Sequence, residues 1–595
     1  GGEDARDEMI LRDLTLTGRL PSLEDLAYSN GFIVYPLGGR IHRWLGQTYG
    51  DWRVAVLYRE LARHEDFEHL IESVYGRTLQ QLNDEFQLAM RRAYYPTAQL
   101  RAPLPVLARR LADVAIKPAY VPDTLDAPDI GEGPAGAAMY MSPVTGYLTI
   151  YRRDLSGRHA RVVAVSGRSA ALESFHPSDS RLDASRPGLL LFSARYQDRD
   201  ALIVWDLRRS RIVGRYQFPS LVSVLSPSWM PDGRSVVFSG LSESGYSDLY
   251  RVTLPDGKLE ALTHDRFQDT DPSPSPDGRE IVFASDRAAG GLDGTVNLFV
   301  WNVATGAVRQ LTRGEWVDES PIWNADGRIW FASDRDGVLN VFSVDSTGAG
   351  RRETSAWTGA FDPAPLPGGT GVLVSGFDRA GIGIYEYHAD SAARTDTFRA
   401  PPLPAAAPAA VAEWQWPTPP DTAGGPAANP YHPHYTLDVA TGDVVVIPGY
   451  GGVQGAAFLL SDLLGDNVIF GSVASYQGKQ FGSFLENLNV AGIYLNQRHR
   501  LNWGIGGFRS AGQNYDGERV VSYVETAVGG LGVLRYPLTR FSRLEATVVV
   551  EHSNRTDFTL PVDEPQRIGW IASNYVSFVH DNSLWIESGP IDGER

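Results

Sequence analysis

The sequence predicts a mainly β chain whose largest part is a β-propeller of about six blades. A short phrase of Asp-Gly and a β-forming run recurs at 231–240, 276–287 and 325–335, with a weaker copy at 367–376. The turn glycines of these copies follow one another at intervals of 45, 49 and 42 residues: Gly233, Gly278, Gly327 and Gly369. A period of this length is typical of propeller blades with four short strands.

Each element of the repeated phrase has a physical role. Asp-Gly favours a tight turn, because glycine adopts positive φ without strain and aspartate can bond its own backbone. A second strand follows in each copy, beginning at Asp248, Asn297, Asn340 and Gly383. Unrelated hairpins would not repeat these elements in one order. Earlier strand-like segments at 139–151 and 189–206 bring the expected count to about six blades over 136–398.

Length and composition limit the possible functions. A chain of 595 residues is expected to form several domains. The net charge of −17 argues against nucleic acid as a partner, and the lack of cysteine excludes disulfides and thiolate chemistry. The polar first residues do not resemble a secretion signal, so we expect the chain to be a fragment of a longer protein, truncated at both ends.

Residues 1–96 are expected to be α-helical. Ser22-Leu23-Glu24-Asp25 and Thr78-Leu79-Gln80-Gln81 have the pattern of helix-start boxes. Apolar residues at 82, 86, 90 and 94 follow the helical period after the second box. Prolines at 103, 105, 118, 122 and 128 predict a connector over 97–135, before the propeller.

Residues 399–431 are rich in proline and alanine, which predicts an extended linker. After it, from 432 to 595, segments of roughly ten residues alternate in polarity and end in polar turns. The expected segments are 467–476, 485–495, 501–508, 520–536, 544–551 and 568–578. This pattern is typical of a transmembrane β-barrel, and we predict the N-terminal part of one; a soluble β-sandwich is the alternative.

Few residues suggest chemistry. His64 and His69 are five apart and would diverge on a helix, unlike the histidines of HExxH. His432 and His434 could share a strand face, but no third ligand is evident. No GxSxG occurs. We therefore predict no catalytic, cofactor or metal site in this stretch.

Propellers usually bind partners through loops at the rim of the central channel. We predict that a protein or peptide ligand binds there. The candidate residues, chosen by loop position, are Arg287, Arg335, Arg379, Asp269, Asp318 and Glu319.

The blades resemble the TolB-like propeller repeat, most clearly over 222–345. The family's Trp-Ser-Pro-Asp-Gly turn is matched by 229–233 except at Met230, and its Ser-Asp-Arg by 285–287 and 333–335. The resemblance implies a six-bladed fold and a protein-binding role in the bacterial envelope.

Two further resemblances concern the flanking regions. Residues 9–13, 18–26, 28–31 and 49–50 resemble the helical tail of gluzincin (peptidase-MA-like) metallopeptidases, whose zinc residues would lie before Gly1. Residues 457–466, 536–545 and 581–595 resemble the outer-membrane barrel of BamA-like surface antigens. These resemblances imply zinc in the full-length parent and contact with outer-membrane lipid.

We therefore expect an outer-membrane-anchored propeller, facing the periplasm or the cell surface. It would be the protein-binding part of a membrane-tethered metallopeptidase-like protein. The alternative is a non-enzymatic assembly or secretion scaffold that binds protein or peptide partners.

Overall fold

The computed structural model divides the chain into two compact units, residues 1–167 with 171–415, and residues 168–170 with 416–595. None of the helices that the structure describes is long and apolar enough to cross a membrane. The structure describes the following residues: 4–26, 33–61, 63, 66–122, 136–157, 159–186, 188–287, 295–369, 371–379, 381–388, 396–399, 431–447, 451–477, 487–516, 521–557, 567–586 and 589–593.

The chain begins with a helical segment, as expected. Its longest helix, α6, starts at a capping box in which Thr78 Oγ1 accepts from the Gln81 N–H and Gln81 accepts from the Thr78 N–H. The predicted stripe of Leu82, Phe86, Met90 and Tyr94 is buried against the other helices. The helices are α1 (Ala5–Leu16), α2 (Leu23–Leu26), α3 (Val34–Tyr49), α4 (Asp51–Leu61), α5 (Phe67–Tyr75), α6 (Leu79–Leu100) and α7 (Leu104–Leu107).

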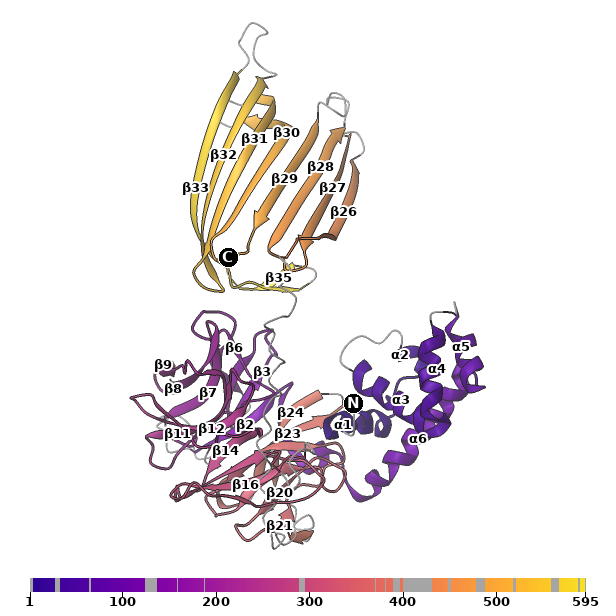
Figure 1. The fold of residues 1–595 in the computed structure, drawn as a ribbon, viewed down its shortest axis with the longest axis vertical. Helices are drawn as coiled ribbons and strands as arrows, with labels where there is room; N and C mark the ends of the chain where they lie inside the picture. The colour runs from indigo at the N-terminus through magenta and orange to yellow at the C-terminus, as the bar shows by residue number, and fades with distance from the viewer. Residues whose placement is uncertain are drawn as a thin grey trace, which may run out of the picture. The chain divides into compact units, whose positions relative to one another are not determined.

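The described residues then form six antiparallel blades (Figure 1), which confirms the expected propeller. Blade 1 is β2 (Ile116–Val121), β3 (Ala137–Ser142), β4 (Thr149–Asp154) and β5 (Ala160–Val165). Blade 2 is β6 (Ser174–Phe175), β7 (Leu189–Tyr196), β8 (Arg199–Asp206) and β9 (Arg211–Tyr216). Blade 3 is β10 (Leu221–Trp229), β11 (Ser235–Ser242), β12 (Ser247–Thr253) and β13 (Lys258–Ala261).

Blade 4 is built from consecutive strands, whereas blades 5 and 6 each add a strand from another part of the chain. Blade 4 is β14 (Asp269–Pro274), β15 (Glu280–Ser285), β16 (Asn297–Asn302) and β17 (Val308–Gln310). Blade 5 is β18 (Asp318–Trp323), β19 (Ile329–Ser333), β20 (Asn340–Val344), β21 (Ala349–Arg352) and β25 (Thr397–Arg399). Blade 6 is β22 (Ala360–Pro365), β23 (Gly371–Asp378), β24 (Gly381–His388) and, outermost, β1 (Ala108–Asp113).

The described part of the predicted connector, 97–135, contains α7, β1 and β2, of which β1 and β2 belong to blades of the propeller. Its prolines occupy positions that regular structure tolerates. Pro103 is the residue before α7, and Pro118 lies at a register shift of β2, where the ladder does not require its missing N–H. β1 pairs with β24 and so joins the start of the propeller to its last blade. Residues 123–135 lie outside the described residues.

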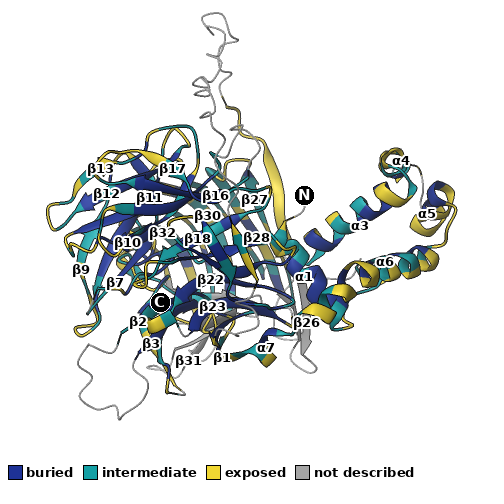
Figure 2. Cartoon of the chain, turned by 90° about the horizontal axis from the view of Figure 1, so that it is seen from below, coloured by how far each residue is buried: buried dark blue, intermediate teal, exposed yellow. Residues whose placement is uncertain are grey.

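The repeated phrase has the turn role predicted for it. Gly233, Gly278 and Gly327 have φ of 62°, 70° and 83°, which glycine adopts without strain. In the first copy, Asp232 Oδ1 accepts from the backbone N–H groups of Arg234 and Ser235. The run after each turn fills the blade core, and Figure 2 shows buried residues along these strands. Phe192, Phe238, Phe283 and Phe331 are fully buried in the second strands of blades 2 to 5.

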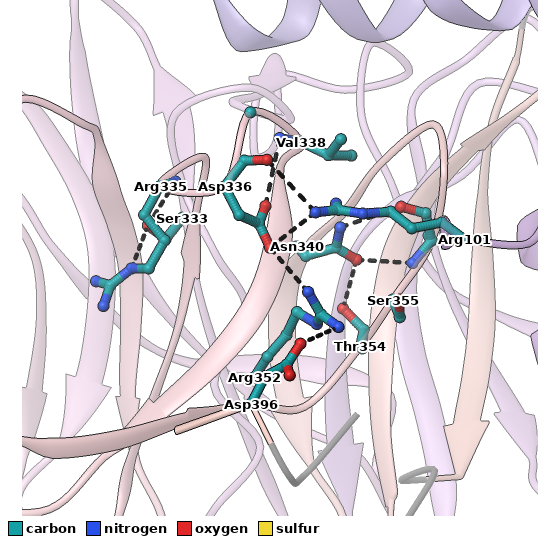
Figure 3. A network of polar contacts seen from close by, with 12 residues as sticks. Arg101, Ser333, Arg335, Asp336, Val338, Asn340, Arg352, Thr354, Ser355 and Asp396 are labelled. Carbon is teal, nitrogen blue, oxygen red and sulfur yellow. Dashed lines mark hydrogen bonds and ion pairs between the residues drawn. The ribbon is translucent and has the colours of Figure 1, made fainter. Parts of the chain in front are cut away.

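A second repeated contact fixes the third strand of blades 3 to 5. The threonines Thr263, Thr312 and Thr354 each accept a hydrogen bond from a backbone N–H near the start of the third strand, at 2.8–2.9 Å. The donors are Leu249, Leu298 and Val341. In blade 5, Thr354 also donates to Asn340 Oδ1, while Asn340 Nδ2 donates to the Ala356 carbonyl (Figure 3). The residue before each of these donors, Asp248, Asn297 or Asn340, therefore connects its blade to the loop that leaves it.

The helical segment packs on blades 5 and 6. Arg12 of α1 is buried and donates to the carbonyls of Gly337 (2.8 Å) and Thr358 (3.1 Å). Beyond α6, Arg101 pairs with Asp336 at 2.9 Å, and Arg352 pairs with the same carboxylate at 3.2 Å (Figure 3). The contacts of Arg12 and Arg101 attach the segment to the propeller.

The second unit contains one sheet of eight strands, each paired antiparallel with the next in the chain. The predicted segments 467–476, 544–551 and 568–578 lie within strands, and the described parts of 485–495, 501–508 and 520–536 overlap strands that begin at 488, 502 and 521. Closure into a barrel stays a prediction. The strands are β26 (Tyr435–Ile447), β27 (Gly451–Asp462), β28 (Asn467–Gln477), β29 (Leu488–Asn496), β30 (Asn502–Asp516), β31 (Val521–Pro537), β32 (Ser542–Asp557) and β33 (Arg567–His580), followed by the hairpin of β34 (Leu584–Ile586) and β35 (Gly589–Asp592). Of the expected linker, residues 400–430 lie outside the described residues.

Candidate functional site

Five blades carry a left-handed, non-glycine residue in the first strand, directly before a proline. Each lies where that strand shifts register against the second strand, which marks a β-bulge. Such a backbone conformation costs about 1–3 kcal/mol per residue, so contacts elsewhere must compensate for it. The residues are Lys117, Ser226, Asp271, Ser320 and Asp362, with φ of 50–57°.

The side chains at these bulges meet across blade boundaries. Lys117 Nζ of blade 1 donates to Asp362 Oδ1 of blade 6 at 2.8 Å, and both side chains are 6% exposed. Ser320 Oγ of blade 5 donates to the same carboxylate oxygen at 3.4 Å. Ser226 Oγ of blade 3 donates to Asp271 Oδ1 of blade 4. The first strands of blades 3 to 6 contact one another in succession, so this polar group lines the central channel.

Blade 2 contributes Arg181, which follows its short first strand. Arg181 Nη1 donates to the Pro321 carbonyl of blade 5 at 2.8 Å. Its Nη2 donates to the Pro272 carbonyl of blade 4 and to Ser228 Oγ of blade 3 at 3.2 Å. One buried guanidinium thus connects blade 2 with three other blades.

Charges of both signs are buried together in the channel. Burial lowers the pKa of Lys117, but Asp362, Asp271 and Glu319 outweigh it, and the net pKa is raised. Burial lowers the pKa of Arg181, against the opposing effect of Asp271 and other carboxylates. The carboxylates thus outweigh burial at Lys117, whereas burial outweighs the carboxylates at Arg181 and lowers its pKa.

One end of this polar group is reached by α1. Arg6 Nη2 donates to Glu319 Oε1 at 2.9 Å. Burial raises the pKa of Glu319, while Arg6 acts to lower it. The helical segment thus supplies one of the charges that balance the channel.

On the side of the Asp-Gly turns the channel widens into a cavity of about 570 Å³, which we call the funnel. All six blades contribute the stretch between their first strand and the following turn, and Arg181 lines the funnel as well. Prolines and aromatic residues dominate this lining: Pro118, Tyr120, Pro122, Trp229, Pro231, Pro274, Pro276, Trp323, Pro365 and Pro367. Arg186 lies over the Trp229 ring at 4.8 Å from its centroid.

The structure brings together two pairs among the predicted rim residues. Arg287 donates to Asp269, and Arg335 pairs with Asp318 at 2.8 Å. The two arginine side chains are only 12% and 9% exposed and lie over aromatic rings, including Phe283 and Phe331 respectively. These contacts give both pairs a structural role between strands.

The other two predicted residues contact α1. Glu319 binds Arg6, and the Arg379 N–H donates to Asp13 Oδ1 at 3.1 Å. The assignment of all six residues to partner binding stays a prediction.

The funnel and channel residues had a sequence signal that the repeated phrase concealed. Ser226, Asp271 and Ser320 each precede a proline and each lie six residues before the turn aspartate, at 232, 277 and 326. A second X-Pro repeat in register with the turn would have located them. Arg181 lacks such a signal, because blade 2 lacks the phrase.

The histidines considered as ligands give no further site. His69 is exposed and its Nδ1 lies 2.6 Å from Asp66 Oδ2, whereas His64 lies outside the described residues. His432 and His434 are exposed. The predicted lack of a metal at these histidines stays a prediction.

The comparisons with known proteins point to the propeller. No family model matches the chain. The Tol-Pal system protein TolB of Francisella tularensis subsp. holarctica (strain OSU18) is 32% identical over 125 residues, 21% of this chain and 28% of the relative. Among solved structures, TolB from Acinetobacter baumannii matches with a TM-score of 0.32 and 20% identity, covering 43% of this chain and 64% of that one. A prolyl endopeptidase structure matches with a TM-score of 0.27 and 12% identity, over 80% and 60%.

Residues 1–415 thus contain a six-bladed β-propeller with a polar channel and one apolar funnel. The propeller is TolB-like, as its repeats and the similarity to TolB indicate. The chain spans 28% of the length of the curated relatives it matches.

Proposed function

We infer that this chain is an envelope propeller protein that binds a peptide segment of a protein partner in the funnel. The observation that carries the proposal is the lining shared by all six blades. Apolar walls of proline and aromatic rings favour an extended peptide, which buries apolar side chains there. The volume of the funnel, about 570 Å³, is within the range of ligand cavities. Binding of a peptide segment in the funnel is compatible with both alternatives, a metallopeptidase-linked protein and a non-enzymatic scaffold.

Filling the funnel mouth is expected to abolish this binding without affecting the fold. Ala325 lines the funnel and is exposed, so tryptophan at this position obstructs the cavity and removes no packing contact. Linear dodecapeptides selected by phage display on the full chain are the probe, and fluorescence anisotropy measures their affinity. We expect Ala325→Trp to weaken binding by about tenfold or more, which corresponds to about 1.4 kcal/mol.

Ala304→Trp is the matched control, because Ala304 is exposed in an outer turn of blade 4, away from the funnel lining. It should bind the peptides as the wild type does. Equal affinities for all three proteins, or selection of no peptides, would reject the funnel as a binding site.

We further propose that the eight-stranded sheet anchors the chain in the outer membrane. Successive residues of a strand lie on opposite faces, and one face is apolar. Along β32 it carries Leu544, Val548 and Val550, which are 44%, 52% and 44% exposed. The other face carries charges, as where Glu545 pairs with Arg535 (3.2 Å) and Arg543 (2.6 Å). An apolar outer face and a polar inner face are the pattern of a transmembrane barrel.

A lysine on the apolar face is expected to weaken membrane association. Val548 lies near the middle of β32, where lysine facing lipid costs about 2–4 kcal/mol. Flotation of the full chain with phosphatidylethanolamine–phosphatidylglycerol vesicles measures the bound fraction. Val548→Lys should reduce the bound fraction strongly, whereas Thr547→Lys, on the opposite face, should not. Equal loss in the two variants would contradict the proposed orientation.

A further inference from the structure

The boundary between blades 3 and 4 differs in charge from the next boundary, although the two are built alike. Asp248, Asp265 and Asp269 of the first correspond to Asn297, Gly314 and Asp318 of the second, each 49 residues later. Arg287 corresponds to Arg335, 48 residues later, and makes the same bond to the aspartate that starts the first strand. The boundary between blades 3 and 4 thus has three carboxylates and one arginine. The boundary between blades 4 and 5 has one carboxylate and one arginine.

The three carboxylates converge. One oxygen from each of Asp248, Asp265 and Asp269 lies within 4.8 Å of the other two. Asp248 and Asp269 are 2% and 0% exposed, and Asp265 leads to the surface with 34% of its side chain exposed. Asp269 Oδ1 is buried and has no hydrogen-bond partner among the described residues. Arg287 occupies Oδ2 of Asp265 and Oδ2 of Asp269.

The corresponding asparagine shows what is missing at Asp248. Asn297 Oδ1 accepts from the Gly314 N–H, and its Nδ2 donates to the carbonyls of Gly314 (3.4 Å) and Trp316 (3.1 Å). Asp248 Oδ1 keeps the first of these bonds, to the Asp265 N–H at 3.1 Å. Its second oxygen takes the place of the amide group that donates these bonds in blade 4, and an ionised carboxylate has no proton to donate. A cation at this position would replace the missing donor.

We propose that Asp248, Asp265 and Asp269 bind a Ca²⁺ ion that joins blades 3 and 4. Ca²⁺ takes carboxylate and backbone carbonyl oxygens at about 2.3–2.6 Å, so two of its ligands lie at most about 5 Å apart, as these oxygens do. The ion replaces the amide donor present in blade 4 and cancels the excess negative charge that Arg287 leaves. Asp318 also has one unpartnered oxygen, but there a single carboxylate faces Arg335 and the charges already cancel.

Protons compete with the ion. Burial raises the pKa of Asp269 to about 6, against the opposing effect of Arg287, and burial raises the pKa of Asp248. The other charged groups near the site are Asp265 and His264, whose Nδ1 lies 3.9 Å from Asp248 Oδ2.

Thermal unfolding of the full chain, first treated with EGTA, tests the site with Ca²⁺ as the probe. At saturating Ca²⁺ and pH 7.5 we expect the unfolding midpoint to rise by about 3–6 °C. Asp248→Asn supplies the amide of blade 4, so this variant should resemble the wild type or exceed its stability without Ca²⁺. Its response to Ca²⁺ should be lost, and calorimetric affinity should fall by about tenfold or more.

Asp256→Asn is the matched control, since Asp256 is an exposed aspartate of the same blade outside the cluster. It should respond to Ca²⁺ as the wild type does. The proposal is overturned if Ca²⁺ does not shift the wild-type midpoint, or if Asp248→Asn retains the shift. A destabilised Asp248→Asn without Ca²⁺ would contradict the correspondence with Asn297, and then only calorimetry on the folded variant at low temperature decides ion binding.

Discussion

Replacing Arg181 with methionine is expected to destabilise the propeller by about 3–5 kcal/mol. Methionine fills much of the same space but donates no hydrogen bond. The buried carbonyls of Pro272 and Pro321 would lose their donor, and Asp271 would lose a neighbouring cation. Urea unfolding of the full chain, followed by tryptophan fluorescence, should show a lower midpoint.

Two further variants identify the cause. Arg181→Lys keeps the positive charge but lacks the planar guanidinium whose N–H groups reach three blades. We therefore expect a loss of stability between those of the wild type and Arg181→Met. Arg211→Met removes an exposed arginine of β9 and should change stability by less than about 0.5 kcal/mol. If Arg181→Met were as stable as Arg211→Met, the contacts of Arg181 across the channel would not hold the blades together.

Asp362→Asn is expected to cost about 3–5 kcal/mol, because it leaves the Lys117 ammonium buried without its closest carboxylate. The folded pKa of Lys117 is raised, so its contribution is present below the ordinary lysine pKa and is lost as pH rises through the folded pKa. The loss in Asp362→Asn should therefore be complete at pH 7. Urea midpoints at this pH measure it.

The double variant Lys117→Met/Asp362→Leu completes a thermodynamic cycle. An apolar pair removes both charges, so the double variant should recover most of the stability that Asp362→Asn loses. A double variant as unstable as the sum of the single changes Lys117→Met and Asp362→Leu would show that the two side chains do not interact.

The propeller was predictable because its blades repeat the residues that every blade needs. Asp232 and Gly233 shape a turn, and Phe238 fills a core, so their counterparts recur at a fixed interval. The strands of the second unit were predictable for a similar reason, since alternation along Val548 and its neighbours specifies two faces. Local physical requirements leave local patterns.

The site was less predictable, because it depends on what differs between blades. Lys117 and Asp362 are far apart in the sequence and meet only when the ring closes. Arg287 and Arg335 were chosen as rim residues by loop position alone, yet each is paired and packed on aromatic rings. Pro118 suggested a connector, because a proline at a bulge has the same sequence signal as a proline in a loop.

Because β1 pairs with β24, β1 stays without its partner strand during much of the synthesis of the chain. Ala108 pairs with Tyr387, which is 279 residues later. At about 5–20 residues per second, the ribosome needs about 15–55 s to make the partner of a strand that is already complete. Until then β1 is an unpaired edge, and the Lys117 ammonium lacks the Asp362 carboxylate. The nascent chain therefore exposes the unpaired edge of β1 for about 15–55 s, which gives chaperones a defined segment to bind.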